Sequence, residues 1–160
     1  MKSPLRRVAL ALAIVASACA SGDPDLAALQ RESAASLRMP DTVDLGHFYS
    51  DKLSTLEGPQ RAFDAHVFGV QSSDVDVHAF YDREITRLGW QYDFLATSIS
   101  SVELAAWGWC KGAMVFRIGI QDQPRAFRSE FYKGQTFRTV FDARIRGRDP
   151  SLGCPERIPR

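Results

Sequence analysis

The sequence predicts an α+β domain of two layers, with one main helix packed on an antiparallel sheet of four to five strands. Residues 73–88 carry apolar side chains at helical spacing, and segments on both sides of them alternate apolar and polar side chains with the period of a strand. The order is therefore strand, helix and then several strands joined by short turns, which favours antiparallel pairing.

Two strands are expected before the helix. Residues 42–49 form a weak first strand, and Gly58 with Pro59 predicts a loop and turn over residues 52–60. Residues 62–71 form a stronger strand, because an apolar face alternates with a second face that is polar at its start. The apolar face consists of Phe63, Ala65, Val67 and Gly69.

Residues 73–88 are the clearest helix in the chain. Ser73 suits the N-cap position, and Asp76 three residues later can complete a capping box. Gly89 follows the last turn, where a positive φ is common. The stripe that should face the core consists of Val77, Phe80, Tyr81, Ile85 and Leu88.

Further strands are expected after the helix. Residues 90–95 and 113–121 alternate in the manner of strands, and residues 137–145 form the last strand. Residues 102–109 fit either a strand or a short helix, because they contain a Glu-Leu-Ala-Ala stretch. The prolines that follow exclude regular structure near the end of the chain.

The first segment of the chain resembles a bacterial lipoprotein signal. A short basic stretch precedes an apolar run over residues 8–18, which is too short to span a membrane because a spanning helix needs roughly 20 residues. Small residues directly precede Cys19, so we expect removal of residues 1–18 and lipidation of Cys19. Cleavage by ordinary signal peptidase is the alternative, and it would leave a soluble periplasmic or secreted protein.

This signal sets the predicted boundaries. Residues 19–36 are polar and alanine-rich and are expected to form a flexible or helical tether, in which a helix from Asp25 to Leu37 is the helical alternative. Residues 37–149 are expected to form the α+β domain, and residues 150–160 a proline-containing tail. The residue after Cys19 is Ala20, whereas an Asp there would resemble an inner-membrane retention signal. We therefore expect a lipid-anchored protein on the extracytoplasmic side of the cell membrane or the outer membrane.

The charge balance argues against one class of partner. Without the three basic residues of the signal, the chain carries 17 basic against 19 acidic residues. Nucleic-acid-binding domains normally have a basic excess. No nucleic-acid partner is expected.

The chain has three cysteines. With Cys19 assigned to the lipid, Cys110 and Cys154 remain as an even pair in an oxidising compartment, where disulfides form and persist. A bridge between them would close a loop of about 44 residues and fasten the tail to the domain. Two unpaired buried thiols are the alternative.

The predicted helix and the strand after it contain a sequence pattern that is also found in other proteins. Ala79-Phe80-Tyr81, followed by Leu88-Gly89-Trp90, resembles the FY…L…GW pattern of many small uncharacterised bacterial lipoproteins. The likeness covers roughly residues 62–121, with the lipoprotein signal in front. The pattern encodes structure, because it places two aromatic residues on the buried stripe and a glycine at the helix end. The resemblance implies an envelope lipoprotein and transfers no activity.

The sequence contains none of the familiar catalytic motifs, such as a Gly-x-Ser-x-Gly elbow, a phosphate loop or a His-Glu-x-x-His helix. His47, His66 and His78 show no ligand spacing, so no metal and no cofactor is expected. We expect a non-enzymatic binding or structural protein. The alternative is an envelope hydrolase of unfamiliar type, which would need a pocket with His66 near Asp64 or Asp93.

Arg144, Arg146 and Arg148 are the best candidates for a binding surface, because alternate residues of an extended strand point the same way. Such a row suits anionic headgroups or wall polymers. The alternative is an edge strand that is protected by charge. The expected partners are the membrane, through Cys19, and an envelope protein, a wall polymer or a lipid headgroup.

Overall fold

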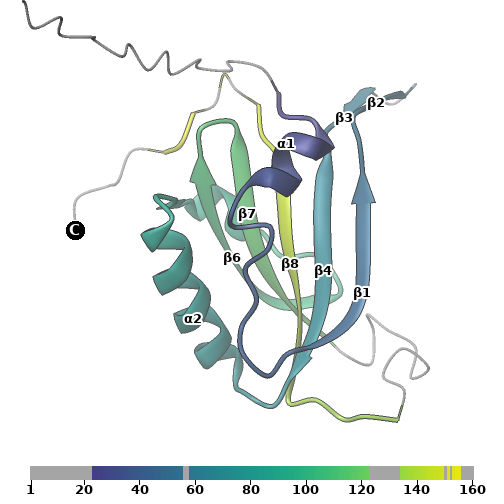
Figure 1. Ribbon diagram of the computed structural model, residues 1–160, viewed down its shortest axis with the longest axis vertical. Helices are drawn as coiled ribbons and strands as arrows, with labels where there is room; N and C mark the ends of the chain where they lie inside the picture. The colour runs from purple at the N-terminus through teal and green to yellow at the C-terminus, as the bar shows by residue number, and fades with distance from the viewer. Residues whose placement is uncertain (1–22, 56–57, 123–133, 150, 152, 156–160) are drawn as a thin grey trace, which may run out of the picture.

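The structure is a computed structural model that describes residues 23–55, 58–122, 134–149, 151 and 153–155 of the 160-residue chain. It is an α+β fold with a six-stranded antiparallel sheet, in the order β1-β4-β8-β7-β6-β5, and a separate two-stranded sheet of β2 and β3 (Figure 1). The elements are α1 (Leu26–Arg31), β1 (Val43–Ser50), β2 (Leu53–Thr55), β3 (Gly58–Gln60), β4 (Phe63–Val70), α2 (Asp74–Arg87), β5 (Gln91–Tyr92), η1 (Phe94–Thr97), β6 (Glu103–Lys111), β7 (Met114–Gln121) and β8 (Thr139–Gly147).

The predicted main helix is confirmed as α2. The Ser73 side chain accepts a hydrogen bond from the Asp76 backbone N–H, and the Asp76 side chain accepts one from the Ser73 backbone N–H, which is a complete capping box. The helix ends at Leu88, and Gly89 follows with a φ of 84°. The helix buries Val77, Tyr81 and Ile85 against the sheet.

The packed domain begins earlier than residue 37. Asp25 caps α1, and this short helix packs on β4 and β8 with Leu29 completely buried. Ala34 is also buried, and Glu32 forms an ion pair with Lys111 at 3.0 Å. The predicted tether over residues 19–36 is therefore corrected, because residues 26–36 belong to the core layer. Residues 19–22 lie outside the described part of the chain.

The sheet differs from the prediction in its strand count. The prediction of four to five strands is corrected to six. The segment over residues 102–109, which fitted either a strand or a short helix, forms most of the strand β6. The expected strand over residues 90–95 is wrong beyond Tyr92, because Asp93 accepts a hydrogen bond from Leu95 N–H and starts the 3₁₀ helix η1. The expected loop over residues 52–60 contains the small β2–β3 sheet.

The two faces of the large sheet are covered differently. One face packs against α1 and α2 in an aromatic core that includes Trp109, Phe116 and Phe141. On the opposite face η1 packs against β6 and β7, and a small cluster joins Ala96 to Val115 and to the cysteine pair. Figure 1 shows both helices on the same side of the sheet. No helix in the described residues is long and apolar enough to cross a membrane.

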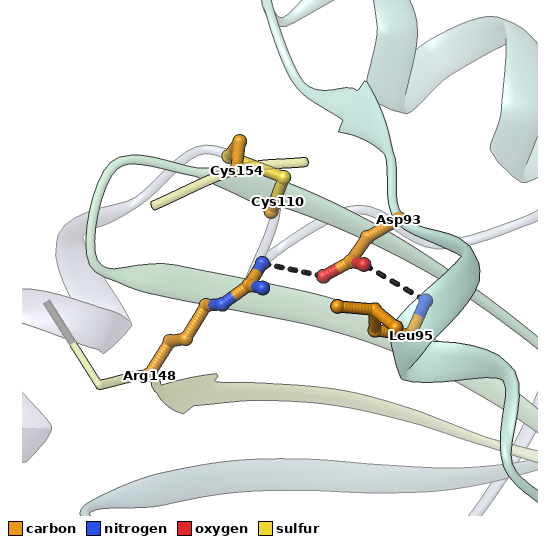
Figure 2. Close-up of a disulfide and its surroundings, with 5 residues drawn as sticks. All are labelled: Asp93, Leu95, Cys110, Arg148 and Cys154. Carbon is orange, nitrogen blue, oxygen red and sulfur yellow. Dashed lines mark hydrogen bonds and ion pairs between the residues drawn. A yellow bond between two sulfur atoms is a disulfide. The ribbon is translucent and has the colours of Figure 1, made fainter. Parts of the chain in front are cut away.

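Cys110 and Cys154 form a disulfide, as predicted (Figure 2). Cys110 is completely buried at the end of β6, so the bond fastens the segment that follows β8 onto the second face of the sheet. In the chain-entropy model, closing a loop of this length lowers the entropy of the unfolded chain. The folded state is thereby stabilised by roughly 4 kcal/mol.

A buried ion pair lies beside the disulfide (Figure 2). Arg148 Nη1 lies 2.6 Å from Asp93 Oδ2, and both side chains are almost completely buried. The same carboxylate caps η1 through Leu95 N–H. The ion pair therefore joins the end of β8 to the start of η1.

We expect Arg148→Met to lower the free energy of unfolding by about 3–5 kcal/mol, because it leaves the Asp93 carboxylate buried without a partner. Urea unfolding followed by tryptophan fluorescence measures the loss. The double variant Arg148→Met with Asp93→Asn should regain most of the stability, since the uncompensated charge is gone and the helix cap is kept. A double variant as unstable as the single one would contradict this assignment.

Candidate functional site

The sheet face opposite the two helices carries an arginine face, which we define as Arg117, Arg144 and Arg146. Arg117 and Arg144 are directly paired residues of β7 and β8, and Arg146 follows two residues along β8. Residues that are paired across strands, or that lie two positions apart on one strand, point to the same side of the sheet, so these three side chains share one face. Arg144 and Arg146 are exposed, while Arg117 is mostly buried.

Arg117 is fully engaged by a bidentate pair with Glu103. Its Nη1 lies 2.5 Å from Oε1 and its Nη2 lies 2.7 Å from Oε2, and Nη2 also donates to the Ser98 carbonyl. Burial disfavours the ionised Glu103 carboxyl, but the hydrogen bonds from Arg117 and Ser100 outweigh that effect and lower its pKa. Arg117 is thus a structural member of the arginine face.

Asp142 is a buried carboxylate beneath this face. Its Oδ1 accepts a hydrogen bond from Gln121 Nε2 at 2.5 Å, while its Oδ2 is buried without a hydrogen bond. Arg144 Nε lies 3.5 Å from Oδ2. Burial raises the pKa of Asp142, and the nearby charges of Arg144 and Arg117 offset this only in part.

Arg146 is the member of the arginine face whose charge is not paired within the described part of the chain. It makes no ion pair with any residue that the structure describes. Partial burial and the neighbouring guanidinium groups of Arg144, Arg117, Arg148 and Arg61 lower its pKa. A shallow hollow of about 260 Å³ lies beside it, lined also by Arg61 and Arg148. Asp93 and Asp149 also line the hollow, and they pair with Arg148 and Arg61, so Arg146 is the guanidinium of the hollow with no ion pair among the described residues.

The predicted row of three exposed arginines is corrected at Arg148. Arg148 lies just beyond β8, and its guanidinium is buried against Asp93. The alternative of a charge-protected edge strand is wrong, because β8 is hydrogen-bonded to β4 on one side and to β7 on the other. Arg144 and Arg146 remain as the exposed part of the predicted surface.

The helix-covered face carries a second polar group, the histidine cluster, which we define as His47, Asp64 and His66. His47 and His66 are directly paired residues of β1 and β4, and their rings stack with centroids 4.0 Å apart. Asp64 precedes His66 by two residues on β4, and its Oδ1 lies 2.5 Å from His47 Nε2. A possible ligand atom from each residue lies within 4.8 Å of the others.

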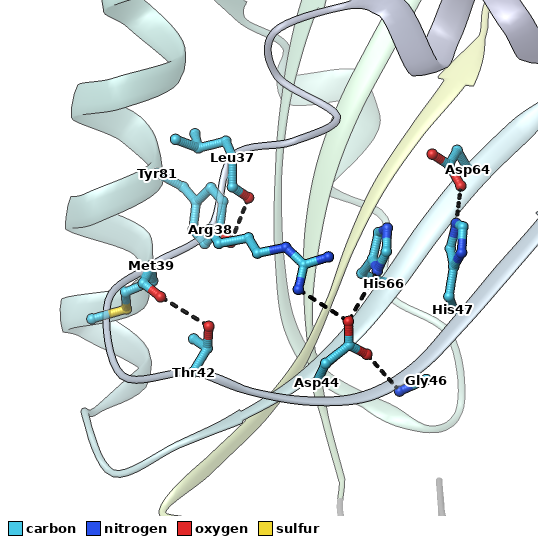
Figure 3. A network of polar contacts seen from close by, with 10 residues as sticks. All are labelled: Leu37, Arg38, Met39, Thr42, Asp44, Gly46, His47, Asp64, His66 and Tyr81. Atoms are coloured by element: carbon cyan, nitrogen blue, oxygen red, sulfur yellow. Dashed lines mark hydrogen bonds and ion pairs between the residues drawn. The ribbon is translucent and has the colours of Figure 1, made fainter.

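A polar network that joins Arg38, before β1, to Asp44 at the start of β1 borders the histidine cluster (Figure 3). Asp44 Oδ2 lies 3.1 Å from Arg38 Nη1 and 3.4 Å from His66 Nδ1, and Asp44 Oδ1 accepts from Gly46 N–H. His66 Nδ1 is buried and makes no hydrogen bond. Burial, followed by the charge of His47, lowers the pKa of His66 and favours its neutral form.

The remaining candidates are separated by the fold. His78 lies on α2 and stacks on Trp107, away from the other two histidines along the sequence and the sheet. Asp93 forms an ion pair with Arg148 and is not part of the histidine cluster. Asp64, the other predicted partner of His66, does lie in that cluster. Cys19 lies outside the described residues. Sequence reasoning missed the grouping of His47 with Asp64, since no local spacing joins residues that are 17 positions apart.

We expect Asp142→Asn to raise the free energy of unfolding at neutral pH. The native carboxylate has a raised pKa, so the folded state is penalised at every pH above that value and the penalty vanishes once both states are protonated. The gain should therefore shrink as the pH falls toward about 4, the ordinary pKa of Asp. Urea unfolding at a series of pH values measures it.

Asp149→Asn provides the matched control. Hydrogen bonds from Ser151 lower the pKa of this exposed carboxylate, so its replacement should bring no gain at neutral pH. A stabilisation as large as that of Asp142→Asn would show that the effect comes from overall charge and not from burial.

Comparisons with known proteins add no family to these observations. No protein-family model matches the chain, and neither the curated proteins nor the solved structures contain a significant match. The resemblance to small envelope lipoproteins therefore stays a prediction from the sequence, and the function has to be argued from the described residues.

Proposed function

We propose that this protein is a lipid-anchored, non-enzymatic binding module on the extracytoplasmic side of a bacterial membrane. In this proposal Cys19 carries the lipid, and the exposed arginines of the arginine face contact anionic lipid headgroups. The observation that carries the proposal is the position of Asp23 at the end of the sheet where Arg146 lies.

The disulfide supports an extracytoplasmic location. Disulfides form and persist in oxidising compartments and are rare in the cytosol, where thiols are kept reduced. The bond between Cys110 and Cys154 closes a long loop and fastens the tail to a buried strand. A signal-like segment before Cys19 is consistent with the same compartment.

The start of the described chain indicates which end of the domain would face the anchor. Asp23 Oδ1 lies 3.2 Å from Arg61 Nη1, and the Asp23 carboxylate lies against Gly147 at the end of β8. Asp23 is only four positions after Cys19 in the sequence. An extended chain of that length reaches about 14 Å. A lipid on Cys19 would thus hold this end of the sheet close to the membrane surface.

Headgroup contact follows from that orientation. Arg146 lies one residue from Gly147 on β8, and Arg144 lies two residues further along. Arg61 lies at the same end but is paired with Asp23 and Asp149, so the charge that this end offers to a headgroup comes from Arg144 and Arg146. Guanidinium groups bind phosphate oxygens well because their planar fork donates two hydrogen bonds at once. Anionic phospholipid is therefore the partner that this end of the domain fits best.

A hydrolase is less well supported by the same geometry. The proposed acid-base partners divide between the two faces, because Asp93 is bound to Arg148 beside η1 while His66 lies on the face covered by the helices. His66 and Asp64 do share a face, but the Asp64 carboxylate is paired with His47, at 2.5 Å from its Nε2. A binding role for the arginine face, unlike hydrolysis at the histidine cluster, explains the exposed charges of Arg144 and Arg146.

We expect the native protein, extracted from its host membrane, to have an intact mass that begins at Cys19 and includes acyl chains. Alkylation should modify two further thiols only after reduction, because Cys110 and Cys154 are bonded. An unlipidated chain that begins after another cleavage site would overturn the anchor, and thiols that react without reduction would overturn the disulfide.

We expect Arg144→Gln with Arg146→Gln to weaken binding to anionic phospholipid vesicles roughly 30-fold, since each basic residue near such a surface contributes about 1 kcal/mol. The measurement is vesicle flotation of a chain that begins at residue 20, which keeps every described residue and removes the lipid. Binding should weaken as salt rises.

Arg83→Gln with Arg87→Gln is the matched control, because it removes the same charge from the exposed side of α2. The control should bind as the unchanged chain does. Equal losses in both double variants, or equal binding to neutral vesicles, would contradict headgroup contact through the arginine face.

A further inference from the structure

We infer that the histidine cluster is a binding site for a single divalent transition-metal ion of the Zn²⁺ class, held by His47, Asp64 and His66. This inference does not depend on the lipid anchor or on the arginine face. It rests on the β1–β4 register, on the burial of Asp64 and on the position of Asp44.

The three ligands come from a rigid part of the fold. His47 and His66 are opposite each other in the antiparallel β1–β4 ladder, and β4 is itself hydrogen-bonded to β8. Asp64 is 6% exposed and lies on the same side of β4 as His66. Two imidazole nitrogens with one carboxylate oxygen form a ligand set that suits Zn²⁺, and also Cu²⁺ and Ni²⁺.

Asp44 supplies an orienting contact of the kind that metal-binding histidines have. In such sites the ring nitrogen that does not bind the metal donates to a carboxylate or a carbonyl. Asp44 Oδ2 lies 3.4 Å from His66 Nδ1, and Arg38 with Gly46 holds the Asp44 carboxylate in place (Figure 3). His66 Nδ1 makes no hydrogen bond in this structure, so a closer approach of Asp44 would be needed for Nδ1 to donate to it and leave the lone pair of Nε2 for the metal.

To accept the ion, the His47 ring has to leave its stack on His66, because rings only 5° from parallel direct their lone pairs in parallel planes that do not converge. Tetrahedral zinc with bonds near 2.1 Å places its ligand atoms about 3.4 Å apart. His47 Nε2 and Asp64 Oδ1 are closer than that at 2.5 Å, while the widest pair lies within 4.8 Å. The His47 side chain is 38% exposed, so its ring can rotate outward to adjust both distances. The same exposure opens a path from solvent and leaves a fourth position for water.

The charges of the surroundings fit a cation. Asp44 and Asp64 contribute two negative charges and Arg38 contributes one positive charge. The charged side chains of the histidine cluster and its neighbours therefore sum to a negative charge, and binding of a divalent cation would make the total positive.

The test is zinc binding by the chain that begins at residue 20, purified without a histidine tag. We expect one Zn²⁺ per chain in competition with a chromophoric chelator, and visible absorption bands of a bound ion when Co²⁺ replaces Zn²⁺. His47→Gln and His66→Gln should each lower the affinity at least about tenfold and abolish the Co²⁺ bands. Asp44→Asn should lower it about 10- to 100-fold while the bands persist, because it removes only the orienting contact.

His78→Gln is the matched control, since it removes the histidine that stacks on Trp107 and leaves the cluster intact. It should bind zinc as the unchanged chain does. Circular dichroism and the urea midpoint confirm that each variant is folded, and His47→Gln at a half-exposed position is the variant with the smallest demand on the fold. A chain that binds no zinc, or one that loses zinc equally in His78→Gln, would overturn the inference.

Discussion

Most residues of β4, β8 and β7 are buried, apart from Arg144 and Arg146 of β8, and this burial constrains the polar side chains inside the sheet. A charged group in such a position needs a partner of opposite charge or a set of hydrogen bonds. Arg117 meets Glu103 in a bidentate pair, and Arg148 meets Asp93 just past the end of β8. Asp142 is less fully compensated, and its raised pKa follows from that deficit. The polar groups of the sheet are thus arranged as matched pairs around an apolar core.

The two faces of the sheet therefore have different chemistry. The helices close one face over aromatic side chains but stop short of β1, where the histidine cluster lies. The other face is closed by η1, the disulfide and the Arg148–Asp93 pair, and beyond that cover the guanidinium groups of Arg144 and Arg146 are exposed. A cation-binding group and a cationic surface can coexist in this small domain because the sheet separates them.

Local patterns predicted the parts of the fold that depend on neighbouring residues. The capping box, the apolar stripe and Gly89 define α2 within one stretch of chain. The failures are non-local. The segment after Tyr92 alternates like a strand, but the Asp93 carboxylate and the contact of Ala96 with Gly108 make it a 3₁₀ helix. The central place of β8 and the meeting of His47 with Asp64 depend on sheet order and register, which no periodicity in the sequence reports.

The place of β8 in the sheet also sets the order in which the chain can fold. β8 lies between β4 and β7, so a chain that has not yet reached residue 139 can form only two partial sheets, each with an open edge. Pairings between residues so far apart in sequence form slowly. The sheet closes only when the last strand inserts, and Cys154 becomes available to Cys110 only after that strand has been made. A chain that stops short of β8 therefore leaves the inner edges of β4 and β7 open to pairing with other chains.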